Sequence, residues 1–334
     1  MVEITLLTTG QVFDCSENDT ILRAALRNGI GMTYSCNVGS CGNCKFEVVE
    51  GSVTHLRSDA PASSERDLAR NRYLGCQAVP NGPCSIKIRT DPAAMPVHKP
   101  LKFKVKVLSK QYLTRDICEF TCAAIDTGPT GFLSGQYALI STASVSGGRA
   151  YSMANTLTRK DWTFAIKKVP NGALTHYLFE QVRVGDMLDV DGPYGTAYLR
   201  PDTPRDIILM AGGSGLSPMV SIAKAAREFG LLAKKKLHFY YGAREQSDLF
   251  DVKSVLQDCA NDLTFFPVLS QPLAAPVWAG DVGFLHDIVA RDFGENLAQH
   301  DIYFAGPPVM ARAIQKMAHE LGTPMDQLYF DEFY

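Results

Sequence analysis

The distribution of hydrophobic and polar residues changes character twice along the chain. The first part, residues 1–90, combines short apolar strands with one amphipathic helix whose apolar residues recur at helical spacing. We expect Asn18 or Asp19 to cap this helix and Gly29 to end it. The apolar face of the helix holds Ile21, Leu22, Ala25 and Leu26, and the strands are expected at Val2–Leu7, Lys45–Val49 and Ser85–Arg89. This pattern predicts a small mixed α+β unit.

The middle part alternates short strands with glycine-rich turns, a pattern typical of an antiparallel β-barrel or sandwich. Its strands are expected at Phe103–Leu108, Tyr137–Ser141, Trp162–Lys168 and Met187–Val190. The last part alternates strands with helices, which predicts a parallel sheet of βαβ units. Its strands are expected at Ile207–Ala211, Lys236–Tyr241, Leu263–Leu269 and Asp301–Ala305, and its helices at about 217–229 and 308–321.

Prolines mark the boundaries between these parts. Three prolines between Asp91 and Pro100 indicate a linker, and a weaker boundary falls at Arg200–Pro204. We therefore predict a multidomain α+β protein with domains at 1–90, 101–200 and 205–334, the first two joined by the linker 91–100.

Composition limits the classes of function that are possible. With 46% hydrophobic and 20% charged residues, the 334-residue chain can form packed cores. Its 33 basic and 35 acidic residues give a net charge of −2, which argues against a nucleic-acid partner. The longest charge-free stretches are interrupted by Gly, Ser, Thr and Pro, so no membrane partner or span is expected. Because the N-terminus lacks the features of a secretory signal, we expect a cytoplasmic protein.

Four of the nine cysteines have an informative spacing: Cys36, Cys41, Cys44 and, after 31 residues, Cys76. C-x4-C-x2-C followed by a distant cysteine is the plant-type spacing for a [2Fe–2S] cluster held by four thiolates. Three thiolates of one loop reach a cluster only if the loop wraps tightly, and Gly39 and Gly42 permit the positive φ that this requires. Zinc or unliganded cysteines are the alternatives, although zinc sites more often use two C-x2-C pairs.

Residues 1–90 resemble a plant-type ferredoxin domain, on this spacing together with the helix before it and the strand Lys45–Val49 after it. The resemblance implies a β-grasp fold and a [2Fe–2S] cluster bound by the four cysteines. The remaining five cysteines are scattered, and we interpret them as small buried side chains.

The middle part carries Arg149-Ala-Tyr151-Ser152, and further along Lys167–Thr175 leads into an expected helix. Alone, the four-residue pattern is equally compatible with a surface strand. Its position in a β-segment, before a glycine-led helix and a βαβ segment, resembles the ferredoxin–NADP reductase superfamily, whose barrel binds FAD.

This resemblance implies how FAD is held. Arg149 would hydrogen-bond the pyrophosphate, Tyr151 would stack on the isoalloxazine and Ser152 would hydrogen-bond near flavin N5. The helix opening after Gly172 would present N–H groups to the pyrophosphate, although the family often has a basic residue where Ala173 stands. The residues expected to bind FAD are Arg149, Tyr151, Ser152, Ile166, Lys167, Val169, Gly172, Ala173, Leu174, Thr175 and Tyr334.

The last part places Gly212-Gly-Ser-Gly215 after a strand, with Ser217 as the expected N-cap of the next helix and Pro218 as its first residue. Such a turn lets the backbone approach a pyrophosphate, although an ordinary tight turn fits equally well. Gly306-Pro307 resembles the superfamily's nicotinamide-side loop, except that many members have cysteine where this chain has Ala305. The residues expected to bind NAD are Gly212, Gly213, Ser214, Gly215, Arg244, Gly306 and Pro307.

Coenzyme choice and the chain end give two further expectations. Arg244 has no other basic residue near it in the sequence, and the acidic residues Glu245 and Asp248 follow it. A single cation beside two acids binds a 2′-phosphate poorly, so NADH is favoured over NADPH.

In the superfamily the terminal aromatic covers the flavin where nicotinamide must sit. The resemblance therefore implies that Tyr334 does so here, and Ser152 and Tyr334 are the expected catalytic residues.

The order of ferredoxin, flavin barrel and nicotinamide domain resembles the reductase components of bacterial aromatic-ring-hydroxylating oxygenases. The implied cofactors are NADH, FAD and a [2Fe–2S] cluster, with electrons passing in that order. The implied partner is a terminal oxygenase of the Rieske type, reached directly or through a separate ferredoxin. The alternatives are a diiron monooxygenase partner, or a non-catalytic electron carrier that neither holds FAD nor oxidises NADH.

Overall fold

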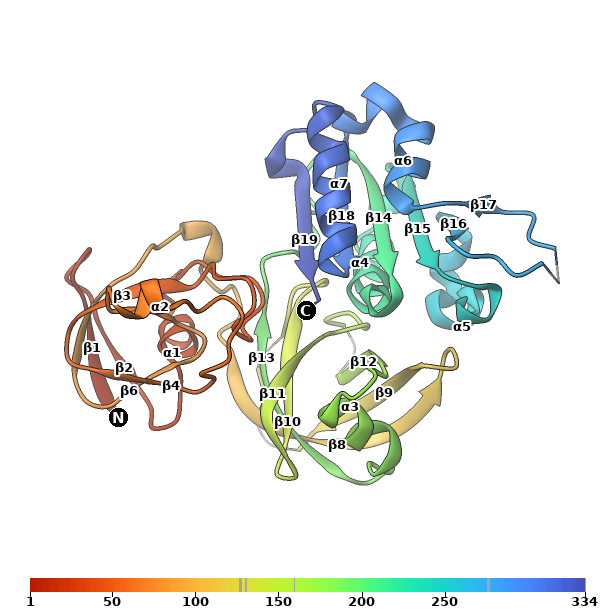
Figure 1. Ribbon diagram of the computed structural model, residues 1–334. Helices are drawn as coiled ribbons and strands as arrows, with labels where there is room; N and C mark the ends of the chain where they lie inside the picture. Colours follow the sequence, from red (N-terminus) through yellow and green to blue (C-terminus); the bar gives the residue numbers. More distant parts are fainter. Residues whose placement is uncertain (126–127, 130, 159, 275–276, 334) are drawn as a thin grey trace.

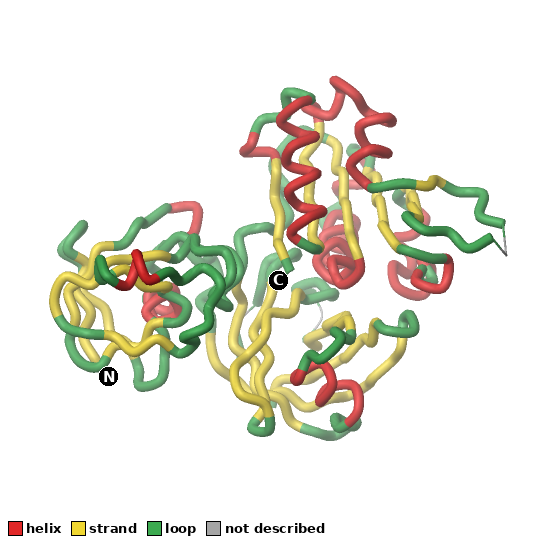
Figure 2. The backbone as a smooth tube through the Cα atoms, in the orientation of Figure 1, coloured by secondary structure: helices red, strands yellow, loops and turns green. Residues whose placement is uncertain are grey.

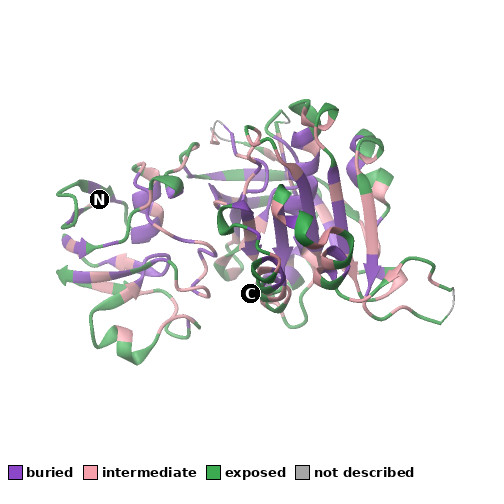
Figure 3. Cartoon of the chain, turned by 90° about the horizontal axis from the view of Figure 1, so that it is seen from above, coloured by how far each residue is buried: buried purple, intermediate pink, exposed green. Residues whose placement is uncertain are grey.

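The computed structural model describes residues 1–333 except 126–127, 130, 159 and 275–276. Three large sheets follow one another along the chain, and a two-stranded sheet accompanies the first of them (Figures 1 and 2). Figure 3 shows buried residues gathered along the strands, with exposed residues on loops and on the outer parts of helices and strands. None of the helices in the described ranges has the length and apolar character that crossing a bilayer requires.

The first unit is a five-stranded mixed sheet in the order β2-β1-β7-β3-β5. Only β1 and β7 run parallel among the neighbouring pairs. The strands are β1 (Val2–Leu6), β2 (Val12–Cys15), β3 (Lys45–Glu50), β5 (Arg72–Leu74) and β7 (Cys84–Lys87), with a separate pair β4 (Val53–His55) and β6 (Ala78–Pro80). The helices are α1 (Ile21–Arg27) and α2 (Glu65–Leu68). The predicted α+β unit is therefore present.

Helix α1 packs its predicted apolar face into this unit, since all four of its predicted apolar residues are fully buried. Its N-cap differs from the prediction. Thr20, and not Asn18 or Asp19, accepts a hydrogen bond from the Arg23 N–H at 3.4 Å. The Asp19 carboxylate instead accepts a hydrogen bond from Arg27, the last residue of α1, at 2.8 Å.

The second unit is a six-stranded sheet in the order β11-β10-β13-β8-β9-β12, with every neighbouring pair antiparallel. The strands are β8 (Leu101–Tyr112), β9 (Ile117–Ala124), β10 (Tyr137–Thr142), β11 (Val145–Ser152), β12 (Asp161–Lys167) and β13 (Met187–Tyr194). A bridge between Met153 and Phe164 brings the two edges of the sheet together, so the sheet curls into a barrel. Helix α3 (Ala173–Glu180) follows β12.

The third unit is a six-stranded parallel sheet in the order β17-β16-β15-β14-β18-β19. Its strands are β14 (Asp206–Gly212), β15 (Leu237–Ala243), β16 (Thr264–Leu269), β17 (Asp281–Val282), β18 (His300–Gly306) and β19 (Leu328–Glu332). Its helices are α4 (Leu216–Glu228), α5 (Val252–Leu256), α6 (Leu285–Phe293) and α7 (Pro308–Glu320). Alternate residues of β14 enter two different cores, one with α4 and one with α6 and α7. Helices therefore cover both faces of the sheet.

The start of α4 corrects one prediction. Gly213–Gly215 form a short 3-10 turn that continues directly into the helix, so Ser217 lies inside α4 and does not cap it. The buried Ser217 hydroxyl instead bonds the backbone of Ala165, accepting from its N–H at 2.9 Å and reaching its carbonyl at 3.2 Å. Ser217 thus joins the nicotinamide unit to β12 of the barrel.

Candidate active site and cofactor cavity

One cavity of about 630 Å³ lies where the three units meet. The cysteine loop contributes Ser35, Cys36, Val38, Cys41 and Asn43 to its wall. The barrel contributes Tyr137, the end of β11 and the start of α3, and the third unit contributes Ser214, Gln315 and Phe330–Phe333. Segments that the sequence analysis assigned to a cluster, to FAD and to NAD therefore border one continuous space.

The four cysteines are arranged as two pairs. A hydrogen bond from Cys41 lowers the pKa of Cys36 to about 5, and Cys44 and Cys76 contact each other in the same way. Two pairs of thiolates are what two bridged iron atoms need, because each iron takes two protein sulfurs. The donor set therefore suits a two-iron cluster.

The loop around these cysteines has the geometry that was predicted. Gly39 and Gly42 have φ of +88° and +81°, in the region that favours glycine. The N–H groups of Ser40 and Cys41 donate to the Cys36 sulfur at 3.3 and 3.4 Å. Gln77 donates to the Cys76 sulfur at 3.6 Å. Such N–H donors stabilise negative charge on the sulfurs and thereby tune a cluster's potential.

The predicted flavin triplet lies at the end of β11. Arg149, Tyr151 and Ser152 all line the cavity. The hydroxyl of Ser152 is buried and has no hydrogen-bond partner among the described residues. An unpaired buried hydroxyl is costly, so its presence indicates a ligand that supplies the missing bond. The Arg149 guanidinium donates to the Gly148 carbonyl at 3.1 Å and remains exposed on the cavity side.

The other expected FAD residues divide into two groups. Lys167, Val169, Gly172, Ala173, Leu174 and Thr175 line the cavity at the start of α3. Gly172 caps that helix without a side-chain bond, and the first turn of α3, whose N–H groups no cap satisfies, borders the cavity. The Thr175 hydroxyl already bonds Gly172 and Val169 within the loop. Ile166, in contrast, is buried in the barrel core and its side chain does not reach the cavity.

The predicted nicotinamide turn lies at the carboxyl end of the parallel sheet. Gly212 ends β14 and Gly213 has φ of +58°. A Cβ on Gly215 would overlap the Ala305 carbonyl oxygen, which shows how closely this turn approaches β18. Gly306 ends β18 and Pro307 follows it. Of the residues predicted to bind NAD, Ser214 is the one whose atoms line the cavity of about 630 Å³.

Arg244 lies at a second cleft, of about 760 Å³, between the barrel and the parallel sheet. Arg115 reaches across this cleft, with its guanidinium 2.8 Å from Asp248 and 3.8 Å from Glu245. Lys167 pairs with Asp116 at 3.0 Å in the same cleft. No sequence pattern points to Arg115, because it is far from Arg244 in the chain.

The chain end supplies residues that the sequence analysis did not assign. Phe333 lines the cavity, and its N–H donates to the Gly306 carbonyl at 2.9 Å. Asp331 also lines the cavity with one carboxylate oxygen unpaired. Burial, with a smaller contribution from the charge on Cys36, raises the pKa of Asp331 to about 7. The predicted residue Tyr334 lies outside the described residues.

Comparison with known proteins accounts for the whole chain. Three family models match: the 2Fe-2S iron-sulfur cluster binding domain over residues 4–81, the oxidoreductase FAD-binding domain over 104–198 and the oxidoreductase NAD-binding domain over 209–316. The ferredoxin–NAD(P)+ reductase CarAd of Metapseudomonas resinovorans is 36% identical over 325 residues, which is 96% of each chain. The chain belongs to the ferredoxin–NAD(P)+ reductase components of oxygenase systems.

Other relatives of this reductase serve different oxygenases. The phenol 2-monooxygenase reductase component DmpP of Pseudomonas sp. (strain CF600) is 30% identical, over 93% of this chain and 88% of the relative. Among solved structures, the ferredoxin reductase in carbazole 1,9a-dioxygenase is 33% identical, covers 100% of this chain and 98% of that one, and superposes with a TM-score of 0.91. This reductase therefore carries binding domains for [2Fe–2S], FAD and NAD in that order.

Replacing Ser152 with alanine tests the role of the unpaired hydroxyl in this reductase. We expect Ser152→Ala to weaken FAD binding about tenfold, the loss of one hydrogen bond worth about 1.4 kcal/mol. The FAD-free protein should be as stable as the wild type or up to about 1 kcal/mol more stable, because an unpaired buried group is removed. FAD titration by fluorescence and thermal unfolding of the apoprotein measure the two effects.

Ser221→Ala is the matched control for this prediction. The Ser221 hydroxyl is also buried, but it donates to the Asn155 carbonyl at 2.6 Å. Its removal leaves that carbonyl unpaired and should lower apoprotein stability by about 1 kcal/mol. A Ser152→Ala apoprotein destabilised as much as Ser221→Ala would contradict our interpretation of the Ser152 hydroxyl.

Proposed function

We propose that this reductase takes hydride from NADH and delivers single electrons to a Rieske-type aromatic-ring dioxygenase, directly or through a separate ferredoxin. FAD, when bound, accepts two electrons as hydride and releases them singly, and a [2Fe–2S] cluster carries one electron at a time. The cavity of about 630 Å³ that joins the cysteine loop, the flavin strand and the nicotinamide unit is the observation that supports this path.

The residues of this chain supply binding and orientation for that path. Ser152 offers a hydroxyl, Arg149 a guanidinium, and the first turn of α3 its free N–H groups. Tyr151 presents an aromatic side chain to the same space. Phe330 and Phe333 wall the side from which nicotinamide would arrive, and these apolar rings exclude water there. Cys36 and Cys41 line the same cavity, so the four cysteines would hold a cluster beside it.

The identity of the partner oxygenase is a separate part of the proposal. A relative in a carbazole dioxygenase system supports the dioxygenase, whereas the phenol monooxygenase relative supports a diiron partner as the second candidate. The test mixes the reductase and NADH with a purified Rieske dioxygenase, with and without its ferredoxin, and with a diiron hydroxylase. The rate of electron delivery to each is measured. Delivery to the diiron hydroxylase alone would refute the Rieske assignment and retain the electron path.

We also propose the domain boundaries and the location expected from the sequence. Domains at 1–90, 101–200 and 205–334, with a linker at 91–100, are supported by the strand ranges 2–87, 101–194 and 206–332 of the three sheets. A cytoplasmic location is supported by the NADH-dependent chemistry proposed above.

NADH should be preferred over NADPH by about tenfold in kcat/KM, which requires about 1.4 kcal/mol of differential binding. The physical reason is that Arg115, which lines the second cleft together with Arg244, is already paired with Asp248 and Glu245. Asp248→Asn should raise the NADPH-to-NADH efficiency ratio, because it frees Arg115 for a 2′-phosphate. Steady-state ferricyanide reduction with both coenzymes measures the ratio. An unchanged ratio in Asp248→Asn would exclude Arg115 as the reason.

A further inference from the structure

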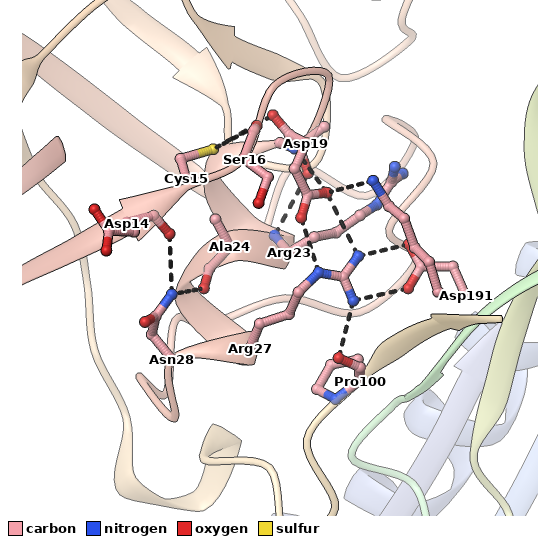
Figure 4. Close-up of polar contacts among 12 residues, drawn as sticks. Asp14, Cys15, Ser16, Asp19, Arg23, Ala24, Arg27, Asn28, Pro100 and Asp191 are labelled. Carbon is pink, nitrogen blue, oxygen red and sulfur yellow. Dashed lines mark hydrogen bonds and ion pairs between the residues drawn. The ribbon is translucent and has the colours of Figure 1, made fainter. Parts of the chain in front are cut away.

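A polar network joins the ferredoxin unit to the flavin barrel at the end of α1 (Figure 4). The Arg27 guanidinium donates two hydrogen bonds to the carboxylate of Asp191 in β13, at 3.0 and 2.8 Å. It also donates to Asp19 at 2.8 Å and to the carbonyl of Pro100, at the end of the linker, at 2.9 Å. One side chain therefore ties together the ferredoxin unit, the linker and the barrel.

This network is more shielded from solvent than most ion pairs among the described residues. The side chains of Arg27, Asp191 and Asp19 are 19%, 13% and 3% exposed. A two-point arginine–carboxylate contact in such a setting fixes geometry more strongly than a surface pair does. Burial alone would raise the pKa of Asp19, but the hydrogen bonds and charge of Arg27 outweigh it and lower the pKa. Asp19 is therefore charged at neutral pH.

A further hydrogen bond joins the two units, from the Gly195 N–H to the Tyr34 hydroxyl at 2.8 Å. Within the barrel, the Tyr194 hydroxyl donates to Asp191 at 2.8 Å. The Tyr137 hydroxyl donates at 2.5 Å to the carbonyl of Ser35, the residue before the first cluster cysteine. Barrel residues Tyr137 and Tyr194 are buried in the same hydrophobic core as the ferredoxin strands. The barrel thus contacts the cluster loop directly.

We propose that Arg27 and Asp191 form a latch that keeps the ferredoxin unit docked on the barrel during turnover and positions the cluster loop against the flavin wall of the cavity. Both are positioning residues, since they act through the docked interface and line no part of the main cavity. Correct placement of two reacting centres lowers the cost of bringing them together, and small displacements are expensive. The proposal rests on the electron path proposed above.

The variants that test the latch are Asp191→Asn, Arg27→Gln and the double variant, each as the holoenzyme. Rapid mixing with NADH should show flavin reduction within about twofold of wild type, because nothing at the nicotinamide side has changed. Cluster reduction should be about tenfold slower in each single variant, equivalent to about 1.4 kcal/mol of lost docking. The double variant should be no slower than the slower single variant, because the two side chains share one interaction.

A structural measurement accompanies the kinetics. Small-angle X-ray scattering should show a larger radius of gyration in the variants, since the ferredoxin unit spends time away from the barrel. Asp191→Asn lies in the barrel and leaves the Arg27–Asp19 pair intact, so it tests the latch even if Arg27→Gln does not fold. Arg27→Lys should give an intermediate rate, because it keeps the charge and loses the two-point contact.

Arg72→Gln is the matched control. Arg72 pairs with Glu47 at 3.7 Å inside the ferredoxin sheet, so its loss should change neither reduction step nor the scattering. The latch is refuted by an unchanged cluster step in Asp191→Asn, by equal slowing of the flavin and cluster steps, or by expansion without slower cluster reduction. If NADH did not reduce the cluster in the wild type, the electron path would fail instead, which separates the two proposals.

Discussion

Cys76→Ser should lose the iron chromophore and lower NADH-driven reduction of a cytochrome or an oxygenase to background. Cys76 is fully buried and paired with Cys44, so its loss leaves one iron without half of its protein ligands. Ferricyanide reduction should continue at about the wild-type rate, because this acceptor takes electrons from flavin and the FAD residues lie on other elements. Iron analysis, the visible spectrum and the two acceptor assays measure these effects. Cys41→Ser should behave in the same way.

Cys84→Ser is the matched control in the same unit. Cys84 is buried, but its thiol donates to the backbone carbonyls of Ser52 and Gly82, bonds that a serine hydroxyl can keep. The variant should retain iron and both activities. Full transfer to the oxygenase by Cys76→Ser would show that the cluster is not on the electron path. Loss of ferricyanide reduction in that variant would show that the units do not work separately.

The sequence predicted best what is encoded locally. The apolar face of α1, the alternation of strands and helices after residue 205 and the glycines of the cysteine loop depend on neighbours a few residues apart, and the structure confirms them. The [2Fe–2S] cluster could be predicted as well, because three of its four cysteines lie in one short loop. Each of these signals arises from backbone geometry that is set within one turn or one strand.

Contacts between distant segments could not be predicted in this way. β19 (Leu328–Glu332) is recognisable as a strand only because it pairs with β18, and the aromatic tail gave no such signal. Ser217 has the residue type and position of a helix cap, yet the chain uses its hydroxyl across a domain boundary. Arg27 and Asp191 are separated by 164 positions, and no local pattern distinguishes them from solvated charges.

Ile166 shows a further limit of sequence reasoning. It precedes Lys167 directly, and a resemblance to a binding segment covers both residues. Side chains alternate along a strand, so Lys167 lines the cavity while Ile166 enters the barrel core. Which of two neighbours faces a ligand depends on how the sheet curls, and that depends on the pairing of all six strands.

Gly215→Ala should destabilise the nicotinamide unit by about 3 kcal/mol, at the upper end for an added methyl group in a packed interior. The added Cβ would overlap the Ala305 carbonyl oxygen and lie 2.5 Å from its carbonyl carbon, both backbone atoms of β18, which is paired on both sides, with β14 and β19. Neither can move without distorting the sheet. Backbone strain plays no part, because Gly215 has φ of −59°, which alanine adopts freely.

The same displacement would move the turn at Gly212–Gly215 away from the coenzyme. We therefore expect the KM for NADH to rise at least about tenfold in the fraction that remains folded, since backbone groups of this turn are the proposed pyrophosphate contacts.

Two control variants separate steric overlap from other causes of instability. Gly230→Ala has open space but φ of +69°, so it should cost about 1 kcal/mol from backbone strain alone. Gly82→Ala has open space and no positive φ, and should be neutral. Urea unfolding and NADH-dependent ferricyanide reduction measure both quantities; a Gly215→Ala protein as stable as Gly82→Ala would mean that β18 and the turn are not packed as closely as described.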